Sequence, residues 1–139
     1  MSDPVFSIQS EFFPTSVDVV FDAFNDVEGW PRWAVHHIKS EVRNPDGTYG
    51  IQTPRRTGVL RLKTERRHGI IDYEFNDPKA GTRLVSGRVA PFADGAVLSI
   101  NYGQPPGLSH EHFAHGMTLV KEELGRLRRL LEVTPGGSG

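Results

Sequence analysis

Histidines are the side chains of this chain best suited to acid–base or metal chemistry, and three of the six lie within one hexapeptide. His110, His112 and His115 miss by one position the His-Glu-x-x-His spacing that places two imidazoles on one helix face for zinc. The chain also has no cysteine and no second pair of ligands at a metal-binding spacing. We therefore expect no metal site and no cofactor, with His110 and His112 facing solvent.

His36 and Tyr73 are the candidates for moving a proton. An imidazole titrates near neutral pH, and a tyrosine hydroxyl can orient a substrate oxygen. If residues 35–43 form a strand, alternation turns His36 inward near Trp33 and turns His37 outward. No serine nucleophile elbow, phosphate-binding glycine loop or pair of inward carboxylates accompanies them. A structural or orienting role therefore explains His36 more simply than catalysis does.

The charge balance argues against polyanionic partners. Sixteen Lys and Arg residues against seventeen Asp and Glu residues give a net charge of -1, so no overall field attracts nucleic acid or an anionic membrane. No segment approaches the roughly 18 consecutive apolar residues of a membrane span, and the absence of cysteine fits a reducing compartment. We expect a cytoplasmic monomer or homodimer with no nucleic-acid partner and no integral membrane association.

A long amphipathic helix near the C-terminus is the element that must hold any such site. Apolar residues recur there at alternating steps of four and three, which indicates one continuous helix face. Ser109 is suited to cap its N-terminus. Arg126, Arg128 and Arg129 lie off this face, where exposure to solvent is expected. The apolar face consists of Phe113, Met117, Val120, Leu124, Leu127 and Leu131.

Short strand-like runs separated by turn signals precede this helix. In the first run, residues 5–13, Phe6, Ile8 and Phe12 share one side, which is typical of a half-buried edge strand. Two short helices are predicted next, over residues 17–24 and around Pro31. Turn residues then recur about every 8–12 positions, as in an antiparallel meander. The six predicted strands are residues 35–43, 49–53, 57–64, 68–75, 82–90 and 96–102.

Strand alternation predicts which side chains face the long helix. The opposite sides carry residues such as Arg61, Lys63 and Glu74, which suit the water-facing side of a sheet. Gly116 lies in the first half of the helix although glycine there costs about 1 kcal/mol relative to alanine, so the missing side chain could leave space for a ligand. We predict a void over Phe113, Gly116, Met117 and Val120; close approach of a strand or of Trp33 would also explain Gly116. The predicted inward residues are Ile51, Leu60, Leu62, Ile71, Tyr73, Phe75, Val85, Val89, Leu98, Ile100 and Tyr102.

The segment Val17–Trp33 carries a resemblance to a known superfamily. Val20-Phe21, Asp26-Val27-Glu28 and Trp30-Pro31-Arg32-Trp33 are similar to the usual entry into the second strand of the START-related, birch-allergen-like proteins (SRPBCC), and within them to the polyketide cyclase/dehydrase-like branch. The order of elements resembles this superfamily over nearly the whole chain. The resemblance implies an α+β helix-grip fold, in which a seven-stranded curved antiparallel sheet wraps around a long C-terminal helix, with two short helices after the first strand.

The resemblance also implies a cavity between the sheet and the last helix. We expect residues 1–133 to form one domain and residues 134–139 a flexible tail. The expected function is binding of a small hydrophobic or amphipathic ligand of lipid, quinone, polyketide or aromatic type. One alternative is a polyketide cyclase/dehydratase-type enzyme that uses the same pocket, and another is an interaction module like the superfamily's chaperone activators. The expected ligand-binding residues are Trp33, His36, Ile51, Leu62, Ile71, Tyr73, Val85, Val89, Ile100, Tyr102, Phe113, Gly116, Met117 and Val120.

Overall fold

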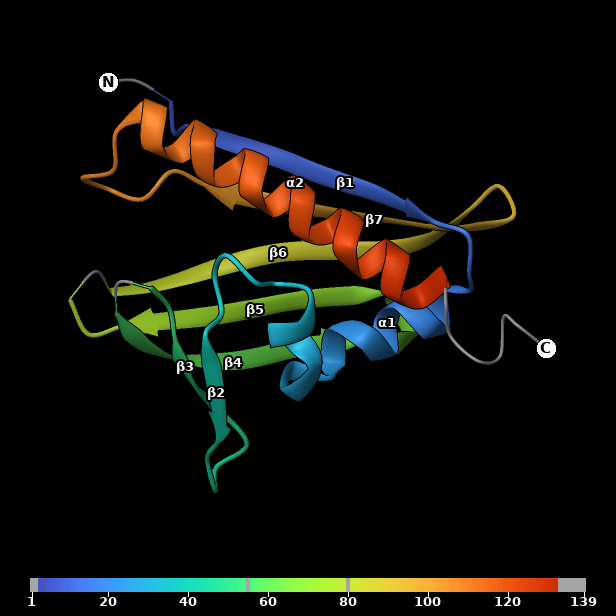
Figure 1. Ribbon diagram of the computed structural model, residues 1–139, viewed down its shortest axis with the longest axis horizontal. Coiled ribbons are helices and arrows are strands. Elements are labelled where there is room, and N and C mark those ends of the chain that lie inside the picture. The colour runs from blue at the N-terminus through green and yellow to red at the C-terminus, as the bar shows by residue number, and fades with distance from the viewer. Residues whose placement is uncertain (1–2, 55, 80, 133–139) are drawn as a thin grey trace.

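A single seven-stranded antiparallel sheet and one long helix organise the chain (Figure 1). The computed structural model describes residues 3–54, 56–79 and 81–132. The strand order is β1-β7-β6-β5-β4-β3-β2, so that β1 and β2 are the two edges. The elements are β1 (Phe6–Phe13), α1 (Val17–Asn25), the 3-10 helix η1 (Val27–Arg32), β2 (Ser40–Arg43), β3 (Tyr49–Gln52), β4 (Thr57–Glu65), the 3-10 helix η2 (Arg66–His68), β5 (Ile70–Asp77), β6 (Gly81–Phe92), β7 (Gly95–Gly103) and α2 (His110–Glu132).

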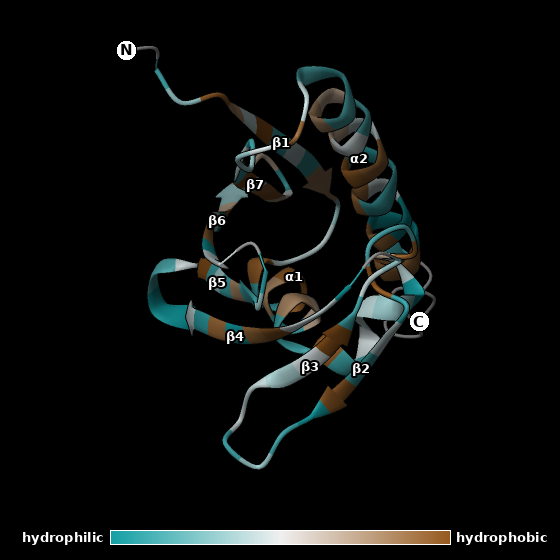
Figure 2. Cartoon of the chain, turned by 90° about the vertical axis from the view of Figure 1, so that its left-hand side faces the viewer, coloured by the Kyte–Doolittle hydropathy of each residue, from teal (hydrophilic) through white to brown (hydrophobic). Residues whose placement is uncertain are grey.

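The predicted fold class is confirmed. The sheet curls around α1 and α2, as Figure 2 shows. Five of the six strands predicted after the short helices are found with ends within two residues of those expected. The exception is the segment 35–43, in which the strand begins only at Ser40. The predicted tail, residues 134–139, lies outside the described residues.

Helix α2 lies against the concave side of the sheet and contacts β1 most extensively. Ser109 caps it as predicted, because its hydroxyl accepts a hydrogen bond from the backbone N–H of His112 (3.1 Å). The six residues of the apolar helix face are buried or half-buried, and Leu124 and Leu127 are almost completely enclosed. This face therefore holds α2 against the sheet by ordinary apolar packing.

The predicted parity of the central strands is confirmed. The eleven side chains expected to face inward are all buried or half-buried. Cross-strand register explains this agreement, because Leu62 lies opposite Tyr73 and Tyr73 lies opposite Val85, so the same face is carried from β4 to β6. Helix α1 covers one part of this face with Val20, Phe21 and Phe24.

Edge strand β1 turns toward the core the opposite side to the one that its sequence predicts. Phe6 and Ile8 are 65% and 59% exposed, whereas Phe13 is fully buried. The register with β7 decides this orientation, since Glu11 lies opposite the inward Leu98. Glu11 pairs there with Arg128 of α2 (3.7 Å). The polar side of β1 thus faces the helix, and the charges of Glu11 and Arg128 compensate each other.

No helix in the described ranges combines the length and the apolar character needed to cross a bilayer.

A substitution at Gly69 tests the close approach between Gly69 and strand β6. Its φ of +67° is left-handed, and a Cβ there would collide with the backbone carbonyl oxygen of Val89. We expect Gly69→Ala to lower the free energy of unfolding by more than about 3 kcal/mol, measured by urea denaturation. Gly47 is the matched control, because its φ is +88° but a Cβ would meet no atom within 4 Å. Gly47→Ala should cost only about 1–2 kcal/mol; equal losses would contradict the close approach.

Candidate functional site

The middle of the concave face carries a row of side chains that are not fully enclosed. Leu62, Tyr73, Val85 and Tyr102 come from four successive strands of the sheet, and all four are half-buried. Half-buried Met117 of α2 packs against the same core. This row, with Met117, is called the accessible row below. It is the part of the predicted site that a ligand could touch.

The other predicted lining residues divide into those closed into the core and those on α2. Ile51, Ile71, Val89 and Ile100 are at most 2% exposed, so they form the closed core beside the accessible row on the same face of the sheet. Phe113 and Val120 are buried on α2 beside half-buried Gly116. Trp33 is buried in an aromatic cluster with Phe24 and Trp30, at centroid distances of 5.2 and 5.8 Å.

Tyr73 and Tyr102 place two hydroxyl groups inside this apolar row. Burial raises the pKa of Tyr73 to about 12, with a hydrogen bond from Tyr102 acting in the opposite direction. Burial also raises the pKa of Tyr102 well above its ordinary value, and its contact with Tyr73 and the negative charge of Glu123 raise it further. Both hydroxyls therefore stay protonated at neutral pH. Since Tyr102 donates its hydrogen bond to Tyr73, the Tyr73 hydroxyl is the one left to donate to a ligand.

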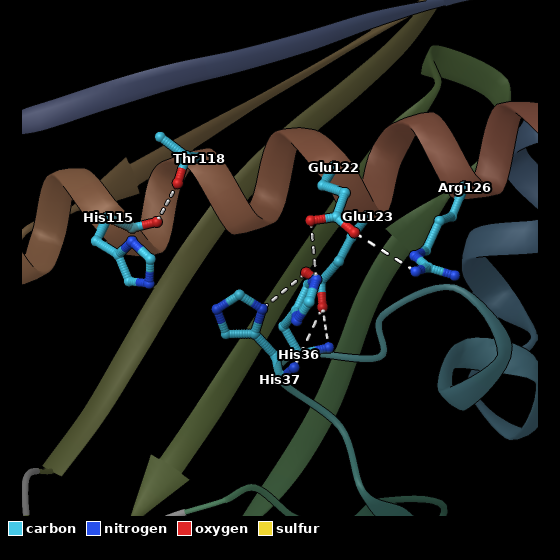
Figure 3. Close-up of polar contacts among 7 residues, drawn as sticks. All are labelled: His36, His37, His115, Thr118, Glu122, Glu123 and Arg126. Atoms are coloured by element: carbon cyan, nitrogen blue, oxygen red, sulfur yellow. Dashed lines mark hydrogen bonds and ion pairs between the residues drawn. The ribbon is translucent and has the colours of Figure 1, made fainter.

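Glu123 is a buried charged group on α2, with only 5% of its side chain exposed. Its Oε2 accepts hydrogen bonds from the backbone N–H groups of His36 (2.8 Å) and His37 (3.2 Å). Its Oε1 lies 2.7 Å from Nδ1 of His37 (Figure 3). These three contacts satisfy a buried carboxylate and attach the loop 34–39 to α2. We call this arrangement the Glu123 clamp.

The prediction that a strand turns His36 inward and His37 outward is wrong. Residues 34–39 form turns instead, because the N–H groups of Ala34 and Ile38 donate to Trp30 and Ala34 carbonyls (2.7 and 2.9 Å). Both imidazoles consequently point to α2 (Figure 3). Nε2 of His36 meets Oε2 of Glu122 at 3.1 Å, and this contact lowers the pKa of Glu122.

The His37–Glu123 pair has the geometry of an oriented base. The carboxylate holds Nδ1, and the opposite ring nitrogen points away from Glu123 along α2 (Figure 3). A carboxylate that fixes one imidazole nitrogen also fixes the tautomer and leaves the other nitrogen available for a proton. His37, rather than His36, is therefore the histidine better placed to accept or donate a proton.

Sequence reasoning missed Glu123. A signal was present, since Glu123 lies three residues after Val120 and four before Leu127, on the flank of the apolar stripe. A carboxylate at such a position must find partners when the helix is buried. Those partners are backbone N–H groups of a loop, which have no signature in the sequence.

Two hollows in the described part of the chain lie at the C-terminal end of α2. One, of about 290 Å³, is lined by Arg32, Arg126, Arg129 and Leu130. The second, of about 150 Å³, adjoins it and is lined mainly by apolar residues that include Trp33 and Leu127. The void predicted over Phe113, Gly116, Met117 and Val120 is neither of these hollows and stays a prediction. A Cβ built on Gly116 would, however, meet no atom within 4 Å.

Among the described residues, no three His, Cys, Asp or Glu side chains are grouped so that they could hold a metal ion. His110 and His112 are exposed, as expected.

Comparison with known proteins identifies the fold. No family model and no curated protein matches the sequence. The Aha1 dimer from Colwellia psychrerythraea has a similar structure (TM-score 0.71, 14% identity, covering 97% of this chain and 99% of that one). Ara h 8.0201 is similar over 95% and 100% of the two chains (TM-score 0.69, 9% identity). DynU16, from the dynemicin biosynthetic locus, matches 95% of this chain with 48% of its own (TM-score 0.68, 18% identity). These likenesses establish a helix-grip fold.

Removal of the Glu123 carboxylate should release the loop 34–39. Glu123→Ala leaves two backbone N–H groups without an acceptor, so we expect a loss of about 1.5–3 kcal/mol in the free energy of unfolding. Glu122→Ala is the control on the same helix, because Glu122 is half exposed and bonds only side chains. Its loss should be clearly smaller. Chemical denaturation of both variants checks this, and equal effects would argue against the clamp.

The interior hydroxyl pair predicts a pH dependence at the alkaline end. Because the folded pKa of Tyr73 lies above the ordinary 10.0, its contribution to stability is complete below pH 10 and is lost as the pH rises toward 12. We expect the tyrosinate absorbance that develops between pH 9 and 11 to be the same in wild type and Tyr73→Phe. A smaller change in the variant over that range would mean that the Tyr73 hydroxyl, and not only part of its ring, is open to solvent.

Proposed function

We propose that the protein binds a small hydrophobic or amphipathic molecule between the sheet and the N-terminal half of α2. The observation that carries this proposal is the accessible row, whose apolar side chains face α2 and yet keep part of their surface uncovered. Exposed apolar area on a concave, otherwise well-packed face is the usual property of a ligand site. Gly116 supports the same location, since the space next to its Cα is open.

The clamp and the aromatic cluster define the closed side of this site. Tyr73 packs edge-on against Trp30, with ring centroids 5.5 Å apart, so the core begins directly behind its ring. Its hydroxyl, which accepts a hydrogen bond from Tyr102, provides a protonated donor for one oxygen of an amphipathic ligand. We infer that the ligand has an apolar body and a carbonyl or hydroxyl oxygen, as quinones, polyketides and many lipids do.

A second candidate function is proton transfer on such a ligand, as in polyketide cyclase/dehydratase-type enzymes. The His37–Glu123 pair favours it, because a carboxylate-oriented imidazole can act as a general base near neutral pH. Tyr73 could donate to an oxygen that becomes negative, since its raised pKa keeps the proton on the hydroxyl. Binding remains the first proposal because it needs only the accessible row, whereas catalysis also needs a reactive ligand next to His37.

Binding of an uncharged dye tests the location. Nile red should gain fluorescence with wild-type protein, and Gly116→Leu should weaken its affinity by about tenfold or more because leucine fills the open space. Gly125→Leu is the matched control on the same helix, where a Cβ would meet only Arg129 at 3.6 Å. Both changes improve helix propensity by about 1 kcal/mol, so neither should prevent folding.

Two results would overturn the proposal: absence of binding to the wild type, or equal affinities of the two variants. If the proposal holds, native mass spectrometry of protein purified from its host would identify the natural ligand. Turnover of that ligand, lost in His37→Gln with binding retained, would favour the enzyme over the carrier.

A further inference from the structure

Three arginines from two elements converge on the larger of the two hollows at the C-terminal end of α2. Arg32 comes from η1, and Arg126 and Arg129 lie one turn apart on α2. Cations near a helix C-terminus are favoured by the helix dipole, which accounts for Arg129 on its own. The dipole does not account for a third guanidinium that η1 brings to the same hollow. Like charges held in one depression repel each other, so their convergence favours an anion.

The carboxylates around this hollow neutralise the arginines only weakly. Asp26 is 4.0 Å from Arg32, with more than half of each side chain exposed, and Glu122 is 3.5 Å from Arg126. Ion pairs of that length and exposure contribute little. Arg129 has no ion pair with any residue in the described ranges. Three guanidinium groups and two neighbouring carboxylates leave the hollow with a net positive charge.

Arg126 is placed to donate into the hollow. It lines the hollow, and 43% of its side chain is exposed. An oxygen bound there can accept from its guanidinium group and share the charge of Arg129.

The adjoining hollow is mainly apolar. It shares Arg32 and Leu130 with the arginine hollow and is lined further by Ala23, Gly29, Trp33, Leu127 and Leu131, with Asp26 as its carboxylate. Its volume of about 150 Å³ equals that of cavities that accept a single benzene ring. Trp33 offers an aromatic wall for such a ring. The two hollows together thus present a place for one ring and a place for one anionic group.

We propose that this double hollow binds a small aromatic carboxylate, with the ring against Trp33 and Leu127 and the carboxylate on Arg32, Arg126 and Arg129. The planar guanidinium group matches a carboxylate through two parallel hydrogen bonds, which selects this head group over a neutral one. The site is separate from the accessible row, because its α2 residues lie between Arg126 and Leu131, whereas the row includes Met117 in the first half of α2. It stands whether or not the row binds a ligand.

Titration of the full-length protein with benzoate tests the site, with the indole N–H of Trp33 as the NMR reporter. Acetate and benzyl alcohol are the two half-ligands, carrying the charge without the ring and the ring without the charge. We expect benzoate to bind at least about tenfold more tightly than either, and Arg126→Gln and Arg129→Gln to weaken it by about tenfold. Arg128→Gln is the matched control, since Arg128 pairs with Glu11 and Glu132 outside the hollow; it should change the affinity by less than about twofold.

The proposal is overturned if benzoate leaves the Trp33 resonance unchanged at millimolar concentration. It is equally overturned if acetate or benzyl alcohol binds as tightly as benzoate, or if Arg128→Gln weakens binding as much as Arg126→Gln. Thermal unfolding of each variant verifies that the protein is folded. Nile red binding in Arg126→Gln should stay at the wild-type level, which separates this site from the accessible row.

Discussion

The Glu123 clamp is the contact on which the arrangement of the concave face depends. It joins the middle of α2 to the loop that follows η1 through two backbone hydrogen bonds and one imidazole contact. Because the carboxylate is buried, each of these bonds has to be made, and the helix and the loop have one relative position in which all three form. On one side of the clamp, α1 and the two tryptophans cover the concave face of the sheet. On the other side the accessible row retains uncovered apolar surface.

This division explains why the two proposed sites differ in chemistry. The accessible row offers apolar side chains and two protonated hydroxyls, which suit a ligand without charge. The double hollow lies at the C-terminal end of α2, at the margin of the core, and offers guanidinium groups beside Trp33, which suit an aromatic anion. A charged ligand would lose hydration in the first site without gaining an opposite charge. The fold itself, shared with Ara h 8.0201 and the Aha1 dimer, decides neither ligand.

Periodicity in the sequence was sufficient for the architecture and for the direction of the central side chains. The strands around Tyr73 are central strands, each paired with another strand on both sides. For such strands, alternation alone separates the core face from the solvent face. Edge strand β1 has one neighbour, and its register with β7 turned the polar side of Glu11 toward an arginine of α2, which no local pattern encodes. His36 and His37 were misjudged because a turn replaced a strand. Tertiary partners of loops, such as Glu123 for these two residues, are a property of the folded chain alone.

Methyl NMR of the full-length protein titrated with Nile red tests the central claim most directly. If the ligand lies on the uncovered side of the clamp, the largest shifts will be those of Leu62, Val85 and Met117, whereas Val89, Leu98 and Leu127 will move little. The largest shifts at Val89 and Leu98 would mean that the core has to open. The largest shifts at Leu127 would place the dye in the double hollow. Either of these patterns would contradict the site proposed here.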